Sequence, residues 1–203
     1  TAHAQHAGSH GAAPASRVVR SAELPAIPSG AVKRFRVPMT HERVEIAPGV
    51  FYDGWTFGGS IPGPVIHVEE GDQVEVWLIN DSDLEHSLDF HSGRMAPSKW
   101  YRDIAPGDSI KFEFTARDPG VFMAHCGTAP VLAHISNGMY FPMVVPPRGL
   151  PVAEKEFIFT QSEFYTTEGD ETTLTLDDEA ALNGVPTYMA FNGVANLYKD
   201  SPI

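Results

Sequence analysis

Four residues in the middle of the sequence have the types and the spacing of a soft metal site. Seven residues separate Cys126 from His134, four more separate His134 from Met139, and His86 lies upstream on another segment. A thiolate, two imidazoles and a weak thioether bond suit copper that cycles between two oxidation states. Taken singly, these residues are better explained as core packing, where cysteine and methionine are common. Together, in this order, they predict a blue-copper (type 1) site.

A second group of side chains lies beside the first. His125 directly precedes Cys126, and His91 follows His86 at an odd spacing. In extended strands both histidines therefore point to the face opposite the first group, and Asp89 shares the parity of His91. This pattern predicts a second copper without thiolate, with Asp89 exchanging protons with whatever binds there. Two surface histidines and a solvated aspartate are the simpler alternative. Two imidazoles leave the site one ligand short, and we expect the third from outside this chain.

The other histidines are weaker candidates for ligands. His41 lies near the start of the fold and His67 in an alternating segment, where a histidine more often packs in the core or faces solvent. Residues 1–3 (Thr-Ala-His) would form a square-planar Cu(II) chelate if the first were a free N-terminus, with His6 and His10 nearby. A disordered tail that happens to carry histidines is the simpler explanation.

The segments around these residues are typical of an all-β fold. Short alternating or β-rich runs, separated by PG, GD and DPG turn signals, predict strands. Their spacing, together with the ligand pattern, favours a Greek-key sandwich of the cupredoxin kind. The predicted strands cover residues 32–37, 50–57, 64–70, 72–80, 109–116, 121–125, 140–145 and 155–165.

Composition divides the chain into three parts. Residues 1–31 begin with a stretch rich in Ala, Gly, His and Ser, and we expect a flexible leader there. Residues 32–148 hold the predicted cupredoxin domain with the type 1 copper. Residues 149–203 are expected to form a linker, an acidic Thr-rich loop and the start of a second, incomplete cupredoxin domain. A faint repeat supports this division, since Phe-Gly-Gly at 57–59 returns as Phe-Asn-Gly at 191–193.

Overall composition narrows the functional classes. The 203 residues are 42% hydrophobic and carry a net charge of -12, from 14 basic and 26 acidic residues. This excess of negative charge argues against nucleic acid as a ligand and favours solubility or a basic protein partner. No run approaches the roughly 18 to 20 apolar residues of a membrane-spanning helix. Because Cys126 is the single cysteine, an internal disulfide is excluded.

With these motifs, the sequence resembles the copper-containing nitrite reductases over roughly residues 35–203. The resemblance is carried by WTFGGSIPGP (55–64), HSLDFH (86–91), DPGVFMAHCGTAPVLAHISNGM (118–139) and the late FNG. It implies dissimilatory nitrite reduction, the one-electron conversion of nitrite to nitric oxide in denitrification. It also implies a homotrimer of two-cupredoxin subunits, with nitrite bound at a type 2 copper between subunits.

The resemblance assigns a role to each candidate residue. Type 1 copper would be held by His86, Cys126, His134 and Met139, and type 2 copper in part by His91 and His125. Asp89 would donate protons, and the electron would pass from type 1 copper through Cys126 and His125. In the family, the third type 2 histidine and a second catalytic histidine come from the second domain. Because this chain only begins that domain, we expect it to be incomplete as an enzyme by itself.

The resemblance also implies partners and a location, and two alternatives stay open. The implied electron donor is a small cupredoxin or cytochrome c, and the implied location is periplasmic or otherwise extracytoplasmic.

A pure blue-copper electron carrier is one alternative function, but it needs neither His91 nor His125. A multicopper oxidase that reduces dioxygen is the other; its trinuclear cluster is built largely from His-x-His pairs, and this sequence has none.

Overall fold

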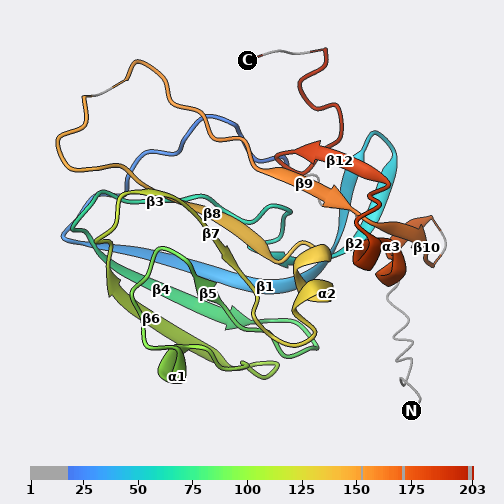
Figure 1. Cartoon of the computed structure of the whole chain (residues 1–203), viewed down its shortest axis with the longest axis horizontal. Coiled ribbons are helices and arrows are strands. Elements are labelled where there is room, and N and C mark those ends of the chain that lie inside the picture. Colours follow the sequence, from blue (N-terminus) through green and yellow to red (C-terminus); the bar gives the residue numbers. More distant parts are fainter. Residues whose placement is uncertain (1–17, 152, 171, 201–202) are drawn as a thin grey trace.

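Two β-sheets face each other and form a sandwich (Figure 1). The computed structural model describes residues 18–203 apart from 152, 171 and 201–202. Helices are few and short, so the all-β class predicted from the sequence is confirmed. No helix within the described ranges is long and apolar enough to cross a membrane.

The larger sheet has six strands and the smaller one has four. The larger contains β1 (Val32–Ala47), β2 (Val50–Phe57), β4 (Gln73–Asn80), β6 (Ser109–Thr115), β10 (Thr166–Glu168) and β11 (Thr173–Leu176), in the order β10-β11-β2-β1-β4-β6. The smaller contains β3 (Ile66–His67), β5 (Asp89–Phe90), β7 (Gly120–His125) and β8 (Tyr140–Val145), in the order β3-β8-β7-β5. A separate pair joins β9 (Gln161–Phe164) to β12 (Tyr188–Phe191). The helices are α1 (Pro97–Trp100), α2 (Val131–Ser136) and α3 (Asp178–Asn183).

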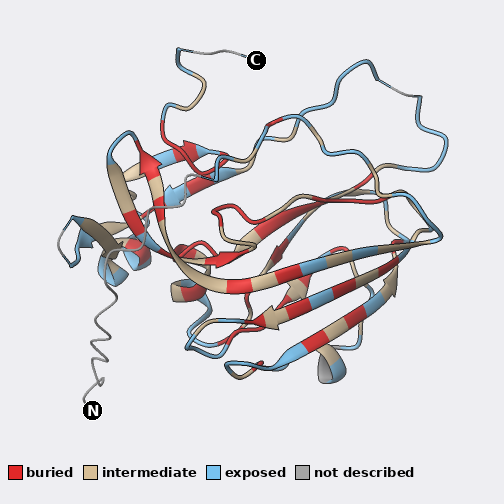
Figure 2. Ribbon diagram, turned by 180° about the vertical axis from the view of Figure 1, so that it is seen from behind, coloured by how far each residue is buried: buried red, intermediate tan, exposed pale blue. Residues whose placement is uncertain are grey.

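Alternating burial places one face of each long strand in the core. In β4, Val74, Val76 and Leu78 are buried, and the residues between them are at least partly exposed. Figure 2 shows the same alternation of red with paler segments along the neighbouring strands. Because side chains on a strand alternate between faces, the inward residues of the two sheets interdigitate. Cys126 and Met139 belong to the core cluster that results.

The first strand continues well beyond the predicted residues 32–37 because it changes partners. Its first half pairs with the parallel β4 up to Met39, and its second half pairs with the antiparallel β2 from Met39 onward. Pro38 lies at the change and has no N–H to donate, but its carbonyl accepts a hydrogen bond from Gly58 N at 2.7 Å. In the sequence Pro38 suggests the end of a strand, but in the structure it marks the place where β1 changes its partner from β4 to β2.

The C-terminal part adds to the larger sheet. β10 and β11 form a hairpin, and β11 pairs in parallel with β2, although the sequence predicted a loop there. β11 does alternate threonine with leucine, but it has only four residues and β10 has three polar ones, so the strand preference of threonine prevails in segments too short to stand out in the sequence. Phe164 of β9 and Ala190 of β12 share a second core cluster with Val44, Ile46 and Tyr52.

The Phe-Gly-Gly and Phe-Asn-Gly repeat has a common geometry. β2 ends at Phe57 and β12 ends at Phe191. Two residues with positive φ follow each phenylalanine, at 66° and 75° in the first case and at 52° and 90° in the second. Each phenylalanine also forms an antiparallel bridge to the residue three positions further on. The two segments thus make the same turn at a strand end, while the domain division at residue 149 stays a prediction.

Residues 18–31, which the sequence placed in a flexible leader, lie against the rest of the chain. Leu24 N donates to Glu156 O at 2.9 Å, and Ile158 N donates to Ala22 O at 2.7 Å. The expectation was therefore wrong for this stretch. These hydrogen bonds join residues 22–24 to residues 156–158, far along the chain, so no local sequence pattern predicts them.

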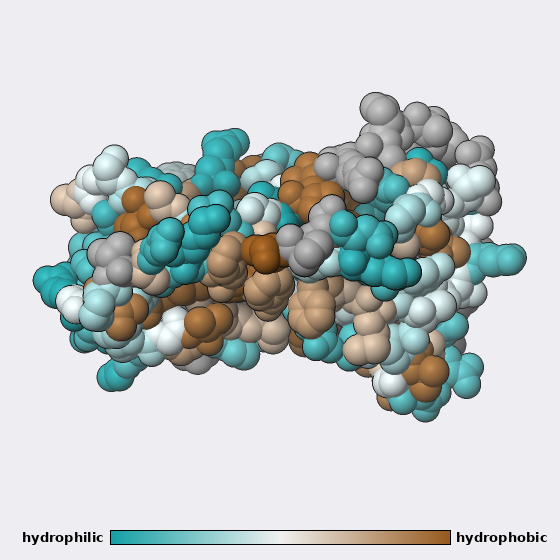
Figure 3. All heavy atoms as spheres, turned by 90° about the horizontal axis from the view of Figure 1, so that it is seen from above, coloured by the Kyte–Doolittle hydropathy of each residue, from teal (hydrophilic) through white to brown (hydrophobic). Residues whose placement is uncertain are grey.

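One side of the molecule exposes apolar side chains from the C-terminal part. Figure 3 looks onto the side that carries β9 and β12 in Figure 1, where brown and teal residues are interspersed. Phe157, Phe159, Met189 and Phe191 are each more than 40% exposed. Scattered apolar residues are ordinary on a protein surface, but four in two neighbouring segments form a local concentration.

Candidate metal centres

The side chains of His86, Cys126 and His134 converge in a buried site. His86 Nδ1 lies 3.1 Å from His134 Nδ1, and Cys126 Sγ lies 3.3 Å from the same nitrogen. The exposed fractions of the three residues are 0%, 0% and 5%. Their ligand atoms all lie within 4.8 Å of one another, so one ion could contact all three.

Local structure positions each of these donors. His86 precedes β5 and exchanges two backbone hydrogen bonds with Ile104, at 3.3 and 2.8 Å. Cys126 directly follows β7, and its N–H donates to Met139 O at 3.0 Å. His134 lies on α2, whose six residues are too few to show a helical period in the sequence. Met139 N in turn donates to His134 O at 3.2 Å, which closes the segment on itself.

A glycine makes this closure possible. Met139 is fully buried in the same cluster as Cys126. Gly138, immediately before it, has a φ of 117°, a conformation that residues with a Cβ rarely adopt. A Cβ at this position would also collide with Ile61 Cδ1. The chain therefore needs glycine where it turns back to bring Met139 beside the other donors.

The strand β2 anchors the segment between His134 and Met139. Trp55 N donates to Asn137 O at 3.0 Å, and the hydroxyl of Tyr52 donates to Asn137 Oδ1 at 3.1 Å. The amide of Asn137 donates back to Ala133 O at 2.9 Å. Burial of the hydroxyl raises the pKa of Tyr52 well above its ordinary value. The ligand segment is thus tied to the larger sheet through one asparagine.

Ser87 organises the surroundings of the sulfur. Its N–H points at Cys126 Sγ at 3.3 Å, and its hydroxyl oxygen accepts from Gly127 N at 3.0 Å. Thr128 Oγ1 lies 3.1 Å from the same oxygen and donates to Asp103 Oδ1 at 2.7 Å. Ser87 stands inside the HSLDFH motif, but its residue type alone does not indicate this role. A hydrogen bond to a thiolate stabilises its charge, so this contact favours the ligand form of Cys126.

Electrostatics favour neutral imidazoles in this site. Burial, with smaller contributions from His134 and His41, lowers the pKa of His86 to about 3. Burial likewise lowers the pKa of His134. Both rings are therefore neutral near pH 7, which is the form in which an imidazole binds a metal.

Asp89, His91 and His125 form a second cluster, at the surface. The Nε2 atoms of His91 and His125 are 3.1 Å apart, and Asp89 Oδ2 lies 3.6 Å from the first and 3.8 Å from the second. His91 is about half exposed, whereas the other two side chains are mostly covered. The structure thus brings together the three residues that strand parity grouped.

Adjacent strands place this cluster back to back with the buried one. Asp89 of β5 is the register partner of His125 of β7, and His91 N donates to Met123 O at 3.2 Å. His125 Nδ1 lies 2.8 Å from Cys126 O, and because a carbonyl oxygen only accepts, Nδ1 carries the proton. Nε2 is then unprotonated and can bind a metal. One residue on, Cys126 points to the interior. Two neighbours in the chain therefore serve two different clusters.

The donor sets can be tested against a metal by their spacing. Ligands bound at about 2.0 to 2.3 Å, as nitrogen and sulfur are on first-row divalent metals, lie somewhat over 3 Å apart. The separations of 3.1 and 3.3 Å in the buried cluster and 3.1 Å in the surface cluster match this expectation. Thiolate and imidazole together select a soft ion, and imidazoles without thiolate suit a harder one. Both sets fit copper.

His41 and His67, the weaker ligand candidates in the sequence, lie outside both clusters. His41 Nε2 lies 3.1 Å from His86 Nε2, so this residue contacts a donor without joining the cluster. His67 Nδ1 lies 2.6 Å from Pro25 O, and its Nε2 has no hydrogen-bond partner in the described part of the chain. The N-terminal histidines at positions 3, 6 and 10 lie outside the described residues.

Comparison with known proteins gives a consistent set of similarities. A family model described as "Multicopper oxidase" matches residues 38–149. A copper-containing nitrite reductase of Neisseria meningitidis serogroup A is 39% identical over 169 residues, which are 79% of this chain and 43% of that protein. Copper nitrite reductase from Nitrosomonas europaea superposes with a TM-score of 0.73 at 36% identity, covering 85% of this chain and 59% of the other. A multicopper oxidase structure gives 0.72 at 27% identity, with coverages of 85% and 57%. The chain spans about half the length, or less, of the curated relatives it matches.

Proposed function

The chain belongs to the multicopper oxidase family and resembles its copper-containing nitrite reductases, and we propose that it supplies the electron-accepting half of a dissimilatory nitrite reductase. Copper is the metal that the family and both donor sets share. The observation that carries the proposal is the pair of donor clusters on opposite faces of one strand end. An electron carrier would need only the first of them.

The buried cluster is the proposed type 1 site. His86, Cys126 and His134 would hold the ion in a trigonal set, with Met139 as the weak fourth ligand. When bound there, copper accepts and releases one electron. The enclosing core limits access of water, and the N–H of Ser87 stabilises the thiolate of Cys126. The larger sheet holds the segment that carries His134 and Met139 through its hydrogen bonds to Asn137.

The surface cluster is the proposed type 2 site. His91 and His125 would offer one Nε2 each, and a third ligand would come from another segment or subunit. Asp89 lies within 4 Å of both nitrogens, so a nitrite bound beside them would meet its carboxyl group. We assign to Asp89 the delivery of a proton to a nitrite oxygen.

The reaction balances with one electron and two protons. Nitrite, two protons and one electron give nitric oxide and water, with one N–O bond broken and the departing oxygen protonated twice. Asp89 supplies the first proton and regains it from solvent, to which it is partly open. The electron reaches the surface cluster from Cys126 through the peptide to His125. The 2.8 Å contact from His125 Nδ1 to Cys126 O offers a parallel, shorter route.

Assembly and location are part of the same proposal. Val121 and Met123 lie on the outer face of β7 with His125, and they are 69% and 41% exposed. An exposed apolar strip next to an incomplete ligand set favours a second copy of the subunit as the cover, and a homotrimer would supply one. The exposed apolar residues Phe157 and Phe159 just before β9, and Met189 and Phe191 of β12, suit contact with a second cupredoxin domain. We place the enzyme in the periplasm or another extracytoplasmic space, with a small cupredoxin or cytochrome c as donor.

Copper counting by electron paramagnetic resonance tests the proposal. In the loaded and assembled protein, with the third ligand supplied, we expect two copper classes and formation of nitric oxide from nitrite with a chemical reductant. Replacement His91→Ala should remove the second class and nitrite reduction while the blue absorption stays. As a matched control, His67→Ala removes a histidine from neither cluster and should keep both classes.

Two results would favour the alternative functions. An assembled wild-type protein that has the third ligand and still shows one copper class and no nitrite reduction would be a blue-copper electron carrier. Dioxygen consumption with a three-copper stoichiometry would point to an oxidase of the trinuclear type, against which the lack of His-x-His pairs already argues.

A further inference from the structure

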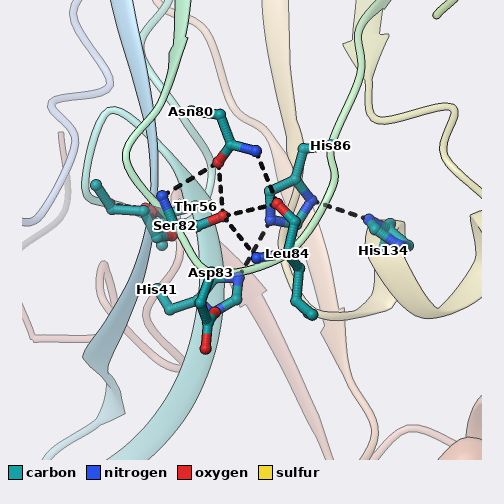
Figure 4. A network of polar contacts seen from close by, with 9 residues as sticks. His41, Thr56, Asn80, Ser82, Asp83, Leu84, His86 and His134 are labelled. Carbon is teal, nitrogen blue, oxygen red and sulfur yellow. Dashed lines mark hydrogen bonds and ion pairs between the residues drawn. The ribbon is translucent and has the colours of Figure 1, made fainter. Parts of the chain in front are cut away.

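His41 contacts the edge of the His86 ring that points away from the buried cluster. His86 turns Nδ1 toward His134, and its Nε2 lies 3.1 Å from Nε2 of His41 (Figure 4). His41 comes from β1 on the opposite sheet, 45 positions away in sequence. It takes part in neither donor cluster. Its role must therefore be sought in its contact with His86.

A carboxylate lies on the other side of His41. Nδ1 of His41 is 2.9 Å from Asp83 Oδ1, and the aspartate side chain is 77% exposed whereas the histidine is only 22% exposed. Three groups thus form a line from solvent to the buried site: carboxylate, imidazole and ligand imidazole. Figure 4 shows this line beside the loop that carries Asp83.

The loop that carries Asp83 is held in place by a buried asparagine. Asn80 is fully buried, and its amide donates to Leu84 O and to Ile104 O, each at 2.7 Å. Its carbonyl accepts from the hydroxyl of Ser82 at 2.7 Å and from Ser82 N at 3.1 Å. The hydrogen bonds of Asn80 therefore hold the turn that contains Asp83, and this turn places the carboxylate beside the ring of His41.

The plane of His41 is also fixed. His41 is the register partner of Trp55 across β1 and β2, and their rings stack at 5.2 Å with an angle of 17°. The same indole meets the ring of His134 edge-on at 4.9 Å. Trp55 therefore keeps the edge of His41 directed at His86 and Asp83.

The positions of the ring protons determine which group donates and which accepts in each of these hydrogen bonds. If His86 uses Nδ1 to bind a metal, its Nε2 must carry the proton and needs an acceptor. His41 can accept at Nε2 only when its own proton is on Nδ1, and Asp83 is the acceptor that favours this tautomer. Without the carboxylate, His41 could present a proton at Nε2 as well, and two donors would then face each other.

We propose that Asp83 and His41 form a positioning relay that fixes the tautomer of His86 and polarises its ring toward the type 1 copper. This inference rests on the proposed type 1 site. A ligand imidazole that donates to a basic partner is a stronger electron donor, and stronger donation stabilises the oxidised metal. The relay therefore lowers the reduction potential of the site.

Potentiometric titration of the blue absorption tests the relay. Asp83→Asn changes only an exposed side chain, and we expect a higher midpoint potential with copper content unchanged. His41→Leu should raise the potential further. His41→Gln should reverse most of that rise, because its amide oxygen can accept the proton of His86. Asp81→Asn, an equal loss of charge in the same loop, is the control for a general electrostatic effect and should shift the potential less than Asp83→Asn.

Nitrogen NMR of the reduced, diamagnetic copper protein reads the tautomer directly. The relay requires a proton on Nδ1 of His41 and an unprotonated Nε2. Observation of the opposite tautomer, or equal potentials for Asp83→Asn and Asp81→Asn, would overturn the relay. A protein that binds no copper would refute both this inference and the proposed function. A blue protein that shows the shifts but leaves nitrite unreduced would support the relay and contradict the proposed function alone.

Discussion

Asp89 lies directly opposite His125 in the register of β5 and β7, with Oδ2 3.8 Å from the Nε2 of the histidine. The backbone pairing of Asp89 with His125 therefore helps to set the distance from the carboxyl group to the imidazole. Proton delivery from a fixed position is effective because the group need not be ordered during the reaction.

The first prediction concerns this carboxyl group. Asp89→Asn should leave both copper classes in place but lower the rate of nitrite reduction by about 10²-fold to 10⁴-fold, the usual contribution of a positioned acid. Copper content and nitric oxide release measure the two effects. Asp118→Asn is the control, since that exposed carboxylate pairs with Arg94. Unchanged turnover in Asp89→Asn would remove the assigned role.

The second prediction concerns the thiolate. Cys126→Ser should abolish the blue absorption and leave the second copper class, because the ligands of the surface cluster are His91 and His125. The hydroxyl can still accept from Ser87 N, so the protein should fold, and circular dichroism checks this. Persistence of the blue band in the variant would show that the thiolate is not its source.

The third prediction concerns the turn before Met139. Gly138→Ala combines an unfavourable φ with the collision against Ile61, and we expect a loss of about 2 to 5 kcal/mol in the free energy of unfolding. Urea denaturation measures the loss. Gly107→Ala is the matched control, since its φ is 82° and no atom lies within 4 Å of the added Cβ. It should cost only the backbone part, about 1 kcal/mol. Equal losses in the two variants would show that the contact with Ile61 is unimportant.

The fourth prediction concerns alkaline pH. The pKa of Tyr52 is raised in the folded protein, so above about pH 10 the unfolded chain loses a proton that the folded chain keeps. The unfolded state then binds fewer protons, and stability falls as pH rises, by up to about 1.4 kcal/mol per pH unit for one group.

Tyr52→Phe separates this effect from the hydrogen bond to Asn137. The variant should be less stable at neutral pH by about 1 to 3 kcal/mol, because Asn137 Oδ1 loses its buried partner. Its loss of stability above pH 10 should be shallower than in the wild type, and urea titrations at several pH values compare the slopes. Parallel slopes would contradict the assignment. Tyr140, whose pKa burial raises to about 12, should account for part of the remaining slope.

Much of the fold could be predicted because its strands alternate. The segments 50–57 and 140–145 were predicted with the bounds that β2 and β8 have in the structure. The hairpin of β10 and β11 was missed because β10 is polar and β11 alternates over only four residues. The path of residues 18–31 depends on distant partners, which a local pattern cannot reveal.

The candidate sites follow from chemistry and parity, but their surroundings do not. Strand alternation separated His125 from Cys126 and grouped it with His91 and Asp89, and the structure places these residues together. The contacts of His41 and Ser87 needed the fold, because only the packing of two sheets brings β1 against His86. The metal assignments themselves stay predictions until copper is counted.

The position of two donors at the end of β7 has a consequence for how this protein can vary. Inserting or deleting one residue within β7 would turn His125 inward and Cys126 outward, because the side-chain period of a strand is two. Evolutionary or engineered changes in the length of this strand should therefore come in pairs, whereas the turn that precedes it is free to accept odd numbers.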